Sequence, residues 1–163
     1  MARPGTSAIV SGRSSPLKEG TGKAPIFWNL GAGIVVENAL ILTMAKILIA
    51  DDSRVHIQLL TGWLQDRGFA VVSALDAVQA WMMGIRSQPD VIILDINMPG
   101  GSGLDVLKRL KTSAKTKHIP VLVVSGSGGG DMRALVKRLG AVDLFEKPLD
   151  CDQLCTAVAG LIV

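Results

Sequence analysis

Four short apolar runs of the sequence each end at a polar residue that could take part in chemistry. KILIA is followed by Asp51 and Asp52, VIIL by Asp95, VLVV by Ser125, and DLFE by Lys147. Such runs are typical of strands buried on both faces of a parallel sheet, which places each polar residue at the carboxyl end of its strand. Ligands of open α/β sheets bind at that edge, so we expect these side chains to share one pocket.

The chemistry of such a pocket would be set by its crowded carboxylates. Asp51, Asp52 and Asp95 disfavour one another unless a cation intervenes, and an all-oxygen site with few protein ligands suits Mg²⁺. Lys147 adds a mobile positive charge, and Ser125 adds a hydroxyl donor. This set suits phosphoryl transfer, in which an aspartate can itself be the nucleophile. A helix cap or a solvated strand end explains any one of these residues, but four matched strand ends favour a functional site.

Apolar runs and helical patterns alternate after Met44, which predicts five βα units and a three-layer α/β sandwich. The interval from Asp95 to Ser125 suits one βαβ unit, whereas that from Asp52 to Asp95 has room for two crossovers and a strand. With the intervening strand at the sheet edge, the five-stranded parallel sheet has the flavodoxin-like order 2-1-3-4-5. Strands are predicted at 46–50, 69–73, 91–95, 121–125 and 142–146, and helices at 53–66, 76–87, 103–112, 131–139 and 150–161.

The first part of the chain differs in composition from the rest. Residues 1–43 begin with a stretch rich in Gly, Ser and Pro, which predicts a disordered extension before a folded domain over 44–163. Ile26 to Leu42 is apolar but short for a membrane-spanning helix and contains Glu37, so no membrane anchor is expected. Because Met44 is followed at once by a strand, we hypothesise that the native protein begins there; a genuine flexible tail is the alternative.

Charge and the cysteine and histidine residues suggest no further site. Four basic and two acidic residues precede Met44 and account for most of the net charge of +3, so the domain is nearly neutral and a nucleic-acid partner is not indicated. Cys151 and Cys155 make an incomplete zinc set and are interpreted as packing residues, whose reduced state suits the cytoplasm. His56 and His118, the only histidines, have no evident partners.

These motifs together resemble the receiver domain of two-component response regulators, over about Ala45 to Val163. The fold expected is therefore the receiver fold. The resemblance rests on the acidic pair Asp51 and Asp52, the DINMPGGSG stretch from Asp95 to Gly103, Ser125 after IPVLVV, and Lys147 with Pro148 after GAVDLFE.

The resemblance implies a role for each residue of the pocket. Asp95 would accept a phosphoryl group from a phosphohistidine of a sensor histidine kinase, and Ser125 and Lys147 would contact the phosphoryl oxygens. The bond between Lys147 and Pro148 would be cis, as is typical of the family. Mg²⁺ would be bound directly by Asp52 and Asp95, through water by Asp51, and by the main-chain carbonyl of Asn97.

A departure from the family pattern concerns the fifth predicted strand. Leu144 stands where the family usually has Tyr or Phe, whose ring swings inward upon phosphorylation. Phe145 is one residue later and should point to the opposite face of its strand. An aromatic switch of the usual kind is therefore not expected, which favours onward phosphoryl transfer slightly over a binding switch.

The function expected is a stand-alone phosphoacceptor in two-component signal transduction, because the sequence ends after the fifth helical pattern. Such a phosphoprotein catalyses only its own phosphorylation and dephosphorylation. Its output would be a target protein or a histidine phosphotransfer protein, and it would be a monomer or a phosphorylation-dependent dimer. The alternative is a Mg²⁺-dependent phosphatase or phosphotransferase acting on small molecules, although this length leaves no room for a separate substrate pocket.

Overall fold

The five apolar runs form one parallel sheet, as predicted. The computed structural model describes residues 45–127 and 129–162, so the predicted extension over 1–43 and the hypothesis about Met44 lie outside the described residues. The sheet order β2-β1-β3-β4-β5 confirms the predicted topology. Every residue of β3 and β4 is buried, which explains why their sequences are continuously apolar. The strands are β1 (Lys46–Ala50), β2 (Ala70–Ala74), β3 (Val91–Asp95), β4 (Val121–Ser125) and β5 (Asp143–Glu146).

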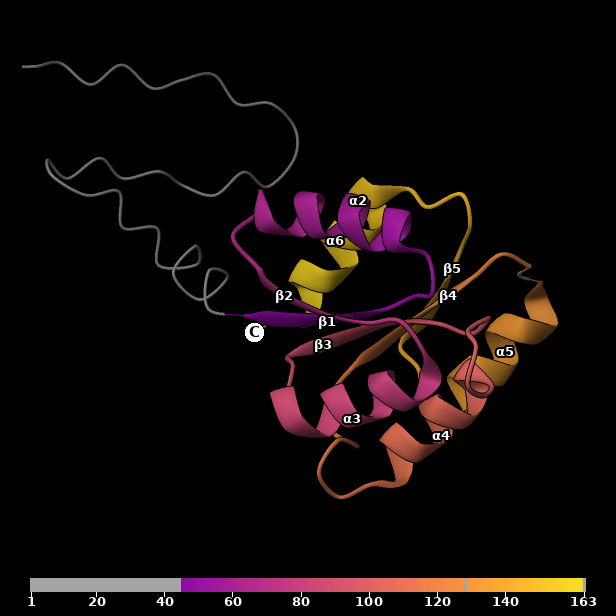
Figure 1. The fold of residues 1–163 in the computed structure, drawn as a ribbon. Coiled ribbons are helices and arrows are strands. Elements are labelled where there is room, and N and C mark those ends of the chain that lie inside the picture. Colours follow the sequence, from indigo (N-terminus) through magenta and orange to yellow (C-terminus); the bar gives the residue numbers. More distant parts are fainter. Residues whose placement is uncertain (1–44, 128, 163) are drawn as a thin grey trace, which may run out of the picture.

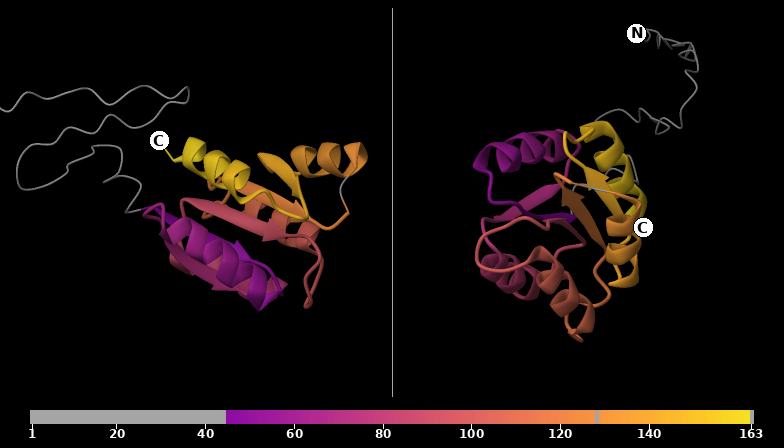
Figure 2. Two further views of the ribbon diagram at one scale, coloured as in Figure 1. Left: turned by 90° about the horizontal axis from the view of Figure 1, so that it is seen from above. Right: turned by 90° about the vertical axis from the view of Figure 1, so that its right-hand side faces the viewer.

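Helices cover both faces of the sheet and complete the three layers (Figures 1 and 2). One face is covered by α2 and α6, and the other by α3, α4 and α5. Among residues 45–127 and 129–162, no helix has the length and apolar character that crossing a membrane requires. The helices are α2 (Arg54–Gln65), α3 (Ala77–Ser87), α4 (Gly103–Thr112), α5 (Gly130–Arg138) and α6 (Cys151–Leu161).

The sheet separates two hydrophobic clusters. Successive strand residues point to opposite faces, so Leu48 belongs to the cluster beneath α3, α4 and α5, whereas Ile47 belongs to the cluster beneath α2 and α6. Leu60 and Leu64, one turn apart on α2, are almost fully buried in the second cluster. Burial of one such side chain contributes about 2 to 3 kcal/mol. Cys151 and Cys155 also lie in this cluster, in agreement with their interpretation as packing residues.

The ends of some elements differ from the prediction by one residue. The second strand begins at Ala70, one residue later than predicted. Phe69 belongs to the apolar run because its side chain is buried in the cluster beneath α2 and α6, but it lies before the paired part of the strand. The fifth strand begins one residue later than predicted, at Asp143, whereas α5 begins and ends one residue earlier, at Gly130 and Arg138. Asp150 caps α6, since its carboxylate accepts a hydrogen bond from the main-chain N–H of Gln153 at 3.0 Å.

Gly103 allows the start of α4 to approach the end of β3 closely. Its main-chain N–H donates to the carbonyl oxygen of Ile96 at 3.1 Å. A Cβ at this position would lie 2.6 Å from the main-chain oxygen of Asp95, and closer still to the Cα of Ile96. Because the obstacle is backbone, a side chain cannot be accommodated by a change of rotamer.

We therefore expect Gly103→Ala to lower the free energy of unfolding by about 2 to 3 kcal/mol. The matched control is Gly62→Ala within α2, where a Cβ would meet nothing within 4 Å. That substitution should raise stability by about 0.5 to 1 kcal/mol, because alanine is the better helix former. Urea denaturation of the three proteins gives the comparison, and equal stability of Gly103→Ala and the unsubstituted protein would contradict the proposed close contact.

Candidate functional site

Three carboxylates meet at the carboxyl edge of the sheet. Asp51 directly follows β1, and Asp95 is the last residue of β3, the strand that pairs with β1. One carboxylate oxygen from each of these residues and from Asp52 lies within 4.8 Å of the others. Asp51 and Asp95 are each only 3% exposed, whereas Asp52 is exposed. The structure thus brings together the three predicted carboxylates at the topological switch point of the sheet.

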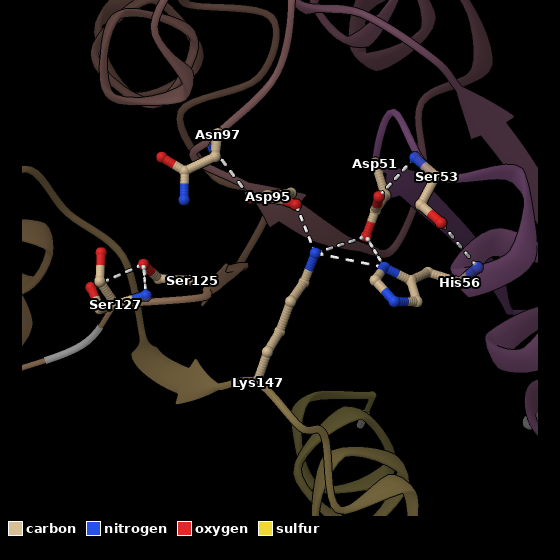
Figure 3. Close-up of polar contacts among 8 residues, drawn as sticks. All are labelled: Asp51, Ser53, His56, Asp95, Asn97, Ser125, Ser127 and Lys147. Carbon is tan, nitrogen blue, oxygen red and sulfur yellow. Dashed lines mark hydrogen bonds and ion pairs between the residues drawn. The ribbon is translucent and has the colours of Figure 1, made fainter.

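Lys147 places its ammonium between the two buried carboxylates (Figure 3). Its Nζ atom lies 2.6 Å from Oδ2 of Asp95 and 3.1 Å from Oδ2 of Asp51. Burial alone would lower the pKa of Lys147, but the hydrogen bonds and charges of Asp95 and Asp51 outweigh this effect and raise the pKa. Lys147 therefore stays cationic and is the resident counter-ion of the pocket. The bond between Lys147 and Pro148 is cis, as the resemblance implied.

Main-chain N–H groups fix the orientation of both buried carboxylates. Asn97 donates its N–H to Oδ1 of Asp95 at 2.8 Å, and Ser53 donates its N–H to Oδ1 of Asp51 at 2.7 Å. In each case the donor is two residues beyond the aspartate, so the loop that follows the strand holds the side chain. Oδ1 is thus taken by the main chain and Oδ2 by the lysine, which leaves each carboxylate with one geometry.

Ser125 reaches the same edge, but its hydroxyl turns away from the lysine (Figure 3). The side chain is fully buried, and Oγ donates to the carbonyl oxygen of Ser127 at 2.8 Å. The N–H of Ser127 donates back to Oγ at 3.2 Å. Ser125 and Lys147, the two residues predicted to contact the phosphoryl group, are also joined through the main chain. The N–H of Lys147 donates to the carbonyl oxygen of Ser125 at 2.9 Å.

His56 belongs to the pocket, and the expectation that it had no evident partner was wrong. Its Nδ1 atom lies 3.2 Å from Oδ2 of Asp51 and 3.3 Å from Nζ of Lys147. Ser53 caps α2 by accepting the N–H of His56 at 3.3 Å, so the histidine occupies the first helical turn. Ser53 directly follows the acidic pair and caps α2, so the residue three positions later lies in the first helical turn, over the end of β1. This spacing could have identified His56.

Leu144 and Phe145 lie on opposite faces of β5, as the alternation of a strand predicted. Leu144 is 1% exposed and belongs to the cluster beneath α3, α4 and α5. Phe145 packs against the other cluster. The position that the switching aromatic ring usually occupies is therefore taken by Leu144, an aliphatic side chain packed in the core.

The donor set of the pocket fits a magnesium ion. Three carboxyl groups face one ammonium, so the pocket has an excess of negative charge, and all its carboxylate donors are hard oxygen atoms. Within the described part of the chain, no hydrogen bond or ion pair engages the exposed carboxylate of Asp52. This carboxylate is thus available to a hydrated cation. Mg²⁺ keeps several water ligands in most protein sites.

The fold and this pocket are those of a receiver domain, a signalling module. Residues 47–159 match the response regulator receiver domain, and the chain belongs to that family. Protein PilH of Pseudomonas aeruginosa is 33% identical over 73% of this chain and 98% of its own length. Sporulation initiation phosphotransferase F of Bacillus subtilis is 34% identical over 69% of this chain and 90% of its own.

Other relatives are longer, and solved structures share the fold. Response regulator PleD of Caulobacter vibrioides is 36% identical over 72% of this chain, but the match spans only 26% of PleD. The chemotaxis response regulator CheY4 of Vibrio cholerae superposes with a TM-score of 0.68 and 30% identity, over 72% of this chain and 98% of CheY4. The resemblance inferred from the sequence is thus confirmed at the level of fold and family.

Proposed function

We propose that Asp95 accepts a phosphoryl group from a phosphohistidine of a sensor histidine kinase, in a reaction that requires Mg²⁺. The observation that carries this proposal is the setting of the Asp95 carboxylate. It is buried, is fixed by the N–H of Asn97 at 2.8 Å, and is paired with the ammonium of Lys147 at 2.6 Å. An oxygen of Asp95 would form a bond to phosphorus as the phosphorus–nitrogen bond breaks and the imidazole leaves with the electron pair.

The other residues of the pocket would neutralise and position the transferred group. Mg²⁺, held by Asp52, Asp95 and the Asn97 carbonyl and through water by Asp51, would supply positive charge beside the phosphoryl oxygens. Lys147 would give up its contact with a carboxylate and bind a phosphoryl oxygen instead. Ser125 would have to release the carbonyl oxygen of Ser127 before its hydroxyl could donate to the phosphoryl group.

Intact-mass spectrometry tests this function directly. Incubation with a cognate kinase or a small acyl-phosphate donor should add one phosphoryl group per chain when Mg²⁺ is present. A chelator such as EDTA should prevent the addition, because the crowded carboxylates then repel the incoming group. Phosphorylation that is unchanged by the chelator would contradict the metal requirement, and no phosphorylation by any donor would contradict the proposed function.

The exposed side of α2 is the candidate contact for the kinase. Val55 and Leu59 are 71% and 53% exposed, are one turn apart, and lie on the helix that carries His56 at the rim of the pocket. Large apolar side chains exposed beside a reaction centre are typical of a docking surface. A partner that binds there would bring its phosphohistidine to the end of β3.

We expect Val55→Asp and Leu59→Asp to slow phosphoryl transfer from a cognate kinase by tenfold or more, since each places a charge in an apolar contact. Transfer from a small acyl-phosphate donor should be unchanged, because that donor does not use the helix surface. Val142→Asp is the matched control, because Val142 is also exposed, at 42%, but precedes β5. Equal losses with both kinds of donor would show damage to the pocket rather than to docking.

The output would be onward transfer to a histidine phosphotransfer protein or docking of a target protein, and we favour transfer. Leu144 is fixed in the core, so the usual aromatic rearrangement has no counterpart here. The Bacillus relative is named as a phosphotransferase, which supports the same choice. Rapid loss of phosphate to a phosphotransfer protein would support transfer. Phosphorylation-dependent affinity for another protein would support docking, and size-exclusion chromatography would show whether phosphorylation produces a dimer.

Small-molecule phosphatase activity is not favoured. The cavity of about 280 Å³ between α3 and α4 is lined by residues such as Ala77, Gly100 and Arg109, and by none of the carboxylate pocket. Repeated turnover of a phosphomonoester that survived Asp95→Asn would be needed to support that function.

We place the protein in the cytoplasm, because unpaired Cys151 and Cys155 suit a reducing compartment.

A further inference from the structure

The cavity between α3 and α4 opens beside exposed apolar side chains. Val78 and Met82, one turn apart on α3, are 56% and 39% exposed. Val78 lines the cavity of about 280 Å³, together with the buried Ala77 of α3 and Val106 of α4. Pockets for drug-sized ligands measure about 300 to 1,000 Å³, so this cavity is better matched to one or two inserted side chains. Met82 suits such a contact, because a methionine side chain adapts to different partners.

Arg109 lines the same cavity and has no carboxylate partner. The central carbon of its guanidinium lies 5.6 Å from the centre of the Trp81 ring, a cation–π contact that joins α4 to α3. Asp105 is one turn earlier on α4, where it could pair with Arg109, but its carboxylate instead lies 3.8 Å from Nζ of Lys108. Over residues 45–127 and 129–162, no ion pair engages Arg109. The guanidinium is thus held in place by Trp81 and is open to an anionic group of a partner.

We propose that the cavity and Arg109 form a docking site for an acidic amphipathic helix of a partner protein. An aliphatic side chain of that helix enters the cavity, and a carboxylate one turn away pairs with Arg109. Charge favours this occupant, because α3 and α4 together contain four basic residues and a single acidic one, Asp105. The site lies on the face of the sheet opposite α2, so it is separate from the proposed kinase contact at Val55 and Leu59 (Figure 1).

The loop after β3 connects this docking site to the proposed phosphoryl acceptor. The carbonyl oxygen of Pro99 in that loop accepts the N–H of Ala77 at 3.1 Å, and Gly100 lines the cavity. Earlier in the same loop, Asn97 donates its N–H to Oδ1 of Asp95 at 2.8 Å. A helix docked against Gly100 therefore contacts the loop that orients Asp95, which suits a partner that regulates the acceptor. This link rests on the proposed role of Asp95, whereas the docking itself does not.

Two synthetic helical peptides, added to the isotope-labelled full chain, test the proposal by nuclear magnetic resonance. Both peptides carry leucines three and four positions apart, flanked by glutamates in one and by lysines in the other. The glutamate peptide should shift the amide signals of Ala77, Gly100 and Gly101, and should bind about tenfold more tightly than the lysine peptide. Asp95→Asn should bind the glutamate peptide as the unsubstituted protein does, so a failure of phosphoryl acceptance is distinguishable from a failure of docking.

Arg109→Glu should reverse the preference, so that the lysine peptide binds more tightly, which a loss of structure would not produce. Lys115→Glu is the matched control and should leave the preference unchanged, since Lys115 is exposed on the loop after α4 and does not line the cavity. Val78→Asp should weaken the glutamate peptide by about tenfold. The proposal is overturned by the absence of shifts, by shifts confined to α2, or by an unaltered preference in Arg109→Glu. Shifts at the same amides that depend on protein concentration without peptide would assign the site to a second copy of the chain instead.

Discussion

Asp95→Asn is expected to abolish phosphoryl acceptance, with no phosphoryl group added to the chain by a kinase or by a small donor. The amide keeps the shape of the side chain and can still accept the N–H of Asn97, but it lacks the nucleophilic charge of the carboxylate. Intact mass after incubation with donor and Mg²⁺ measures the effect. Other aspartates lie nearby, so the position of any residual phosphate should be mapped by peptide analysis.

The control for this substitution is an aspartate outside the pocket. Asp105 lies on α4 with its side chain 68% exposed, and its contact with Lys108 is long, at 3.8 Å. Asp105→Asn should therefore accept phosphate as the unsubstituted protein does. Stoichiometric phosphorylation of Asp95→Asn would show that another residue is the acceptor and would contradict the assignment of Asp95.

Lys147→Met should lower the free energy of unfolding by about 3 kcal/mol in the absence of Mg²⁺. Removing the ammonium leaves Asp51 and Asp95, each about 97% buried, without their cationic partner. Added Mg²⁺ should recover part of the loss, because binding to the folded state adds stability by mass action. Urea denaturation with and without Mg²⁺ provides the measurement.

Lys137→Met is the matched control, since Lys137 also contacts an aspartate, Asp143, but both side chains are substantially exposed. Exposed pairs contribute about 0 to 1 kcal/mol, so the control should lose little stability. The pKa of Lys147 is raised, so its contribution is complete below the ordinary value of 10.5 and is lost as the pH rises through the higher folded-state value. The stability difference between the unsubstituted protein and Lys147→Met should therefore shrink above pH 10.5. A difference that is small at neutral pH, or constant into strong base, would contradict the ion-pair explanation.

The strand ends were the part of the site that the sequence could predict. A buried parallel strand tolerates few polar residues, so Asp95, Ser125 and Lys147 were conspicuous where the apolar runs stopped. The spacing of these runs also determined the strand order, because each crossover needs a minimum length. The same reasoning placed Leu144 and Phe145 on opposite faces of β5, where the structure has them.

Contacts that depend on side-chain direction were not predicted. His56 is five residues from Asp51, and only the rotation of α2 set by its Ser53 cap turns the imidazole towards Lys147. The ring that Ser125 forms with the main chain of Ser127 also escaped prediction, because a loop conformation decides whether the hydroxyl faces the carboxylates or the loop. Pattern and spacing locate a residue along an element, but a local hydrogen bond chooses its partner.

The division of the interior into two clusters by the sheet has an evolutionary consequence. Side chains such as Leu60 and Leu154, which anchor α2 to α6, have no place in the cluster that holds Leu107 and Val136 under α4 and α5. Substitutions that reshape α2, the proposed contact for the kinase, can therefore accumulate without repacking the opposite layer. The two helical layers can diverge separately after gene duplication, while the strand ends between them retain the carboxylate pocket.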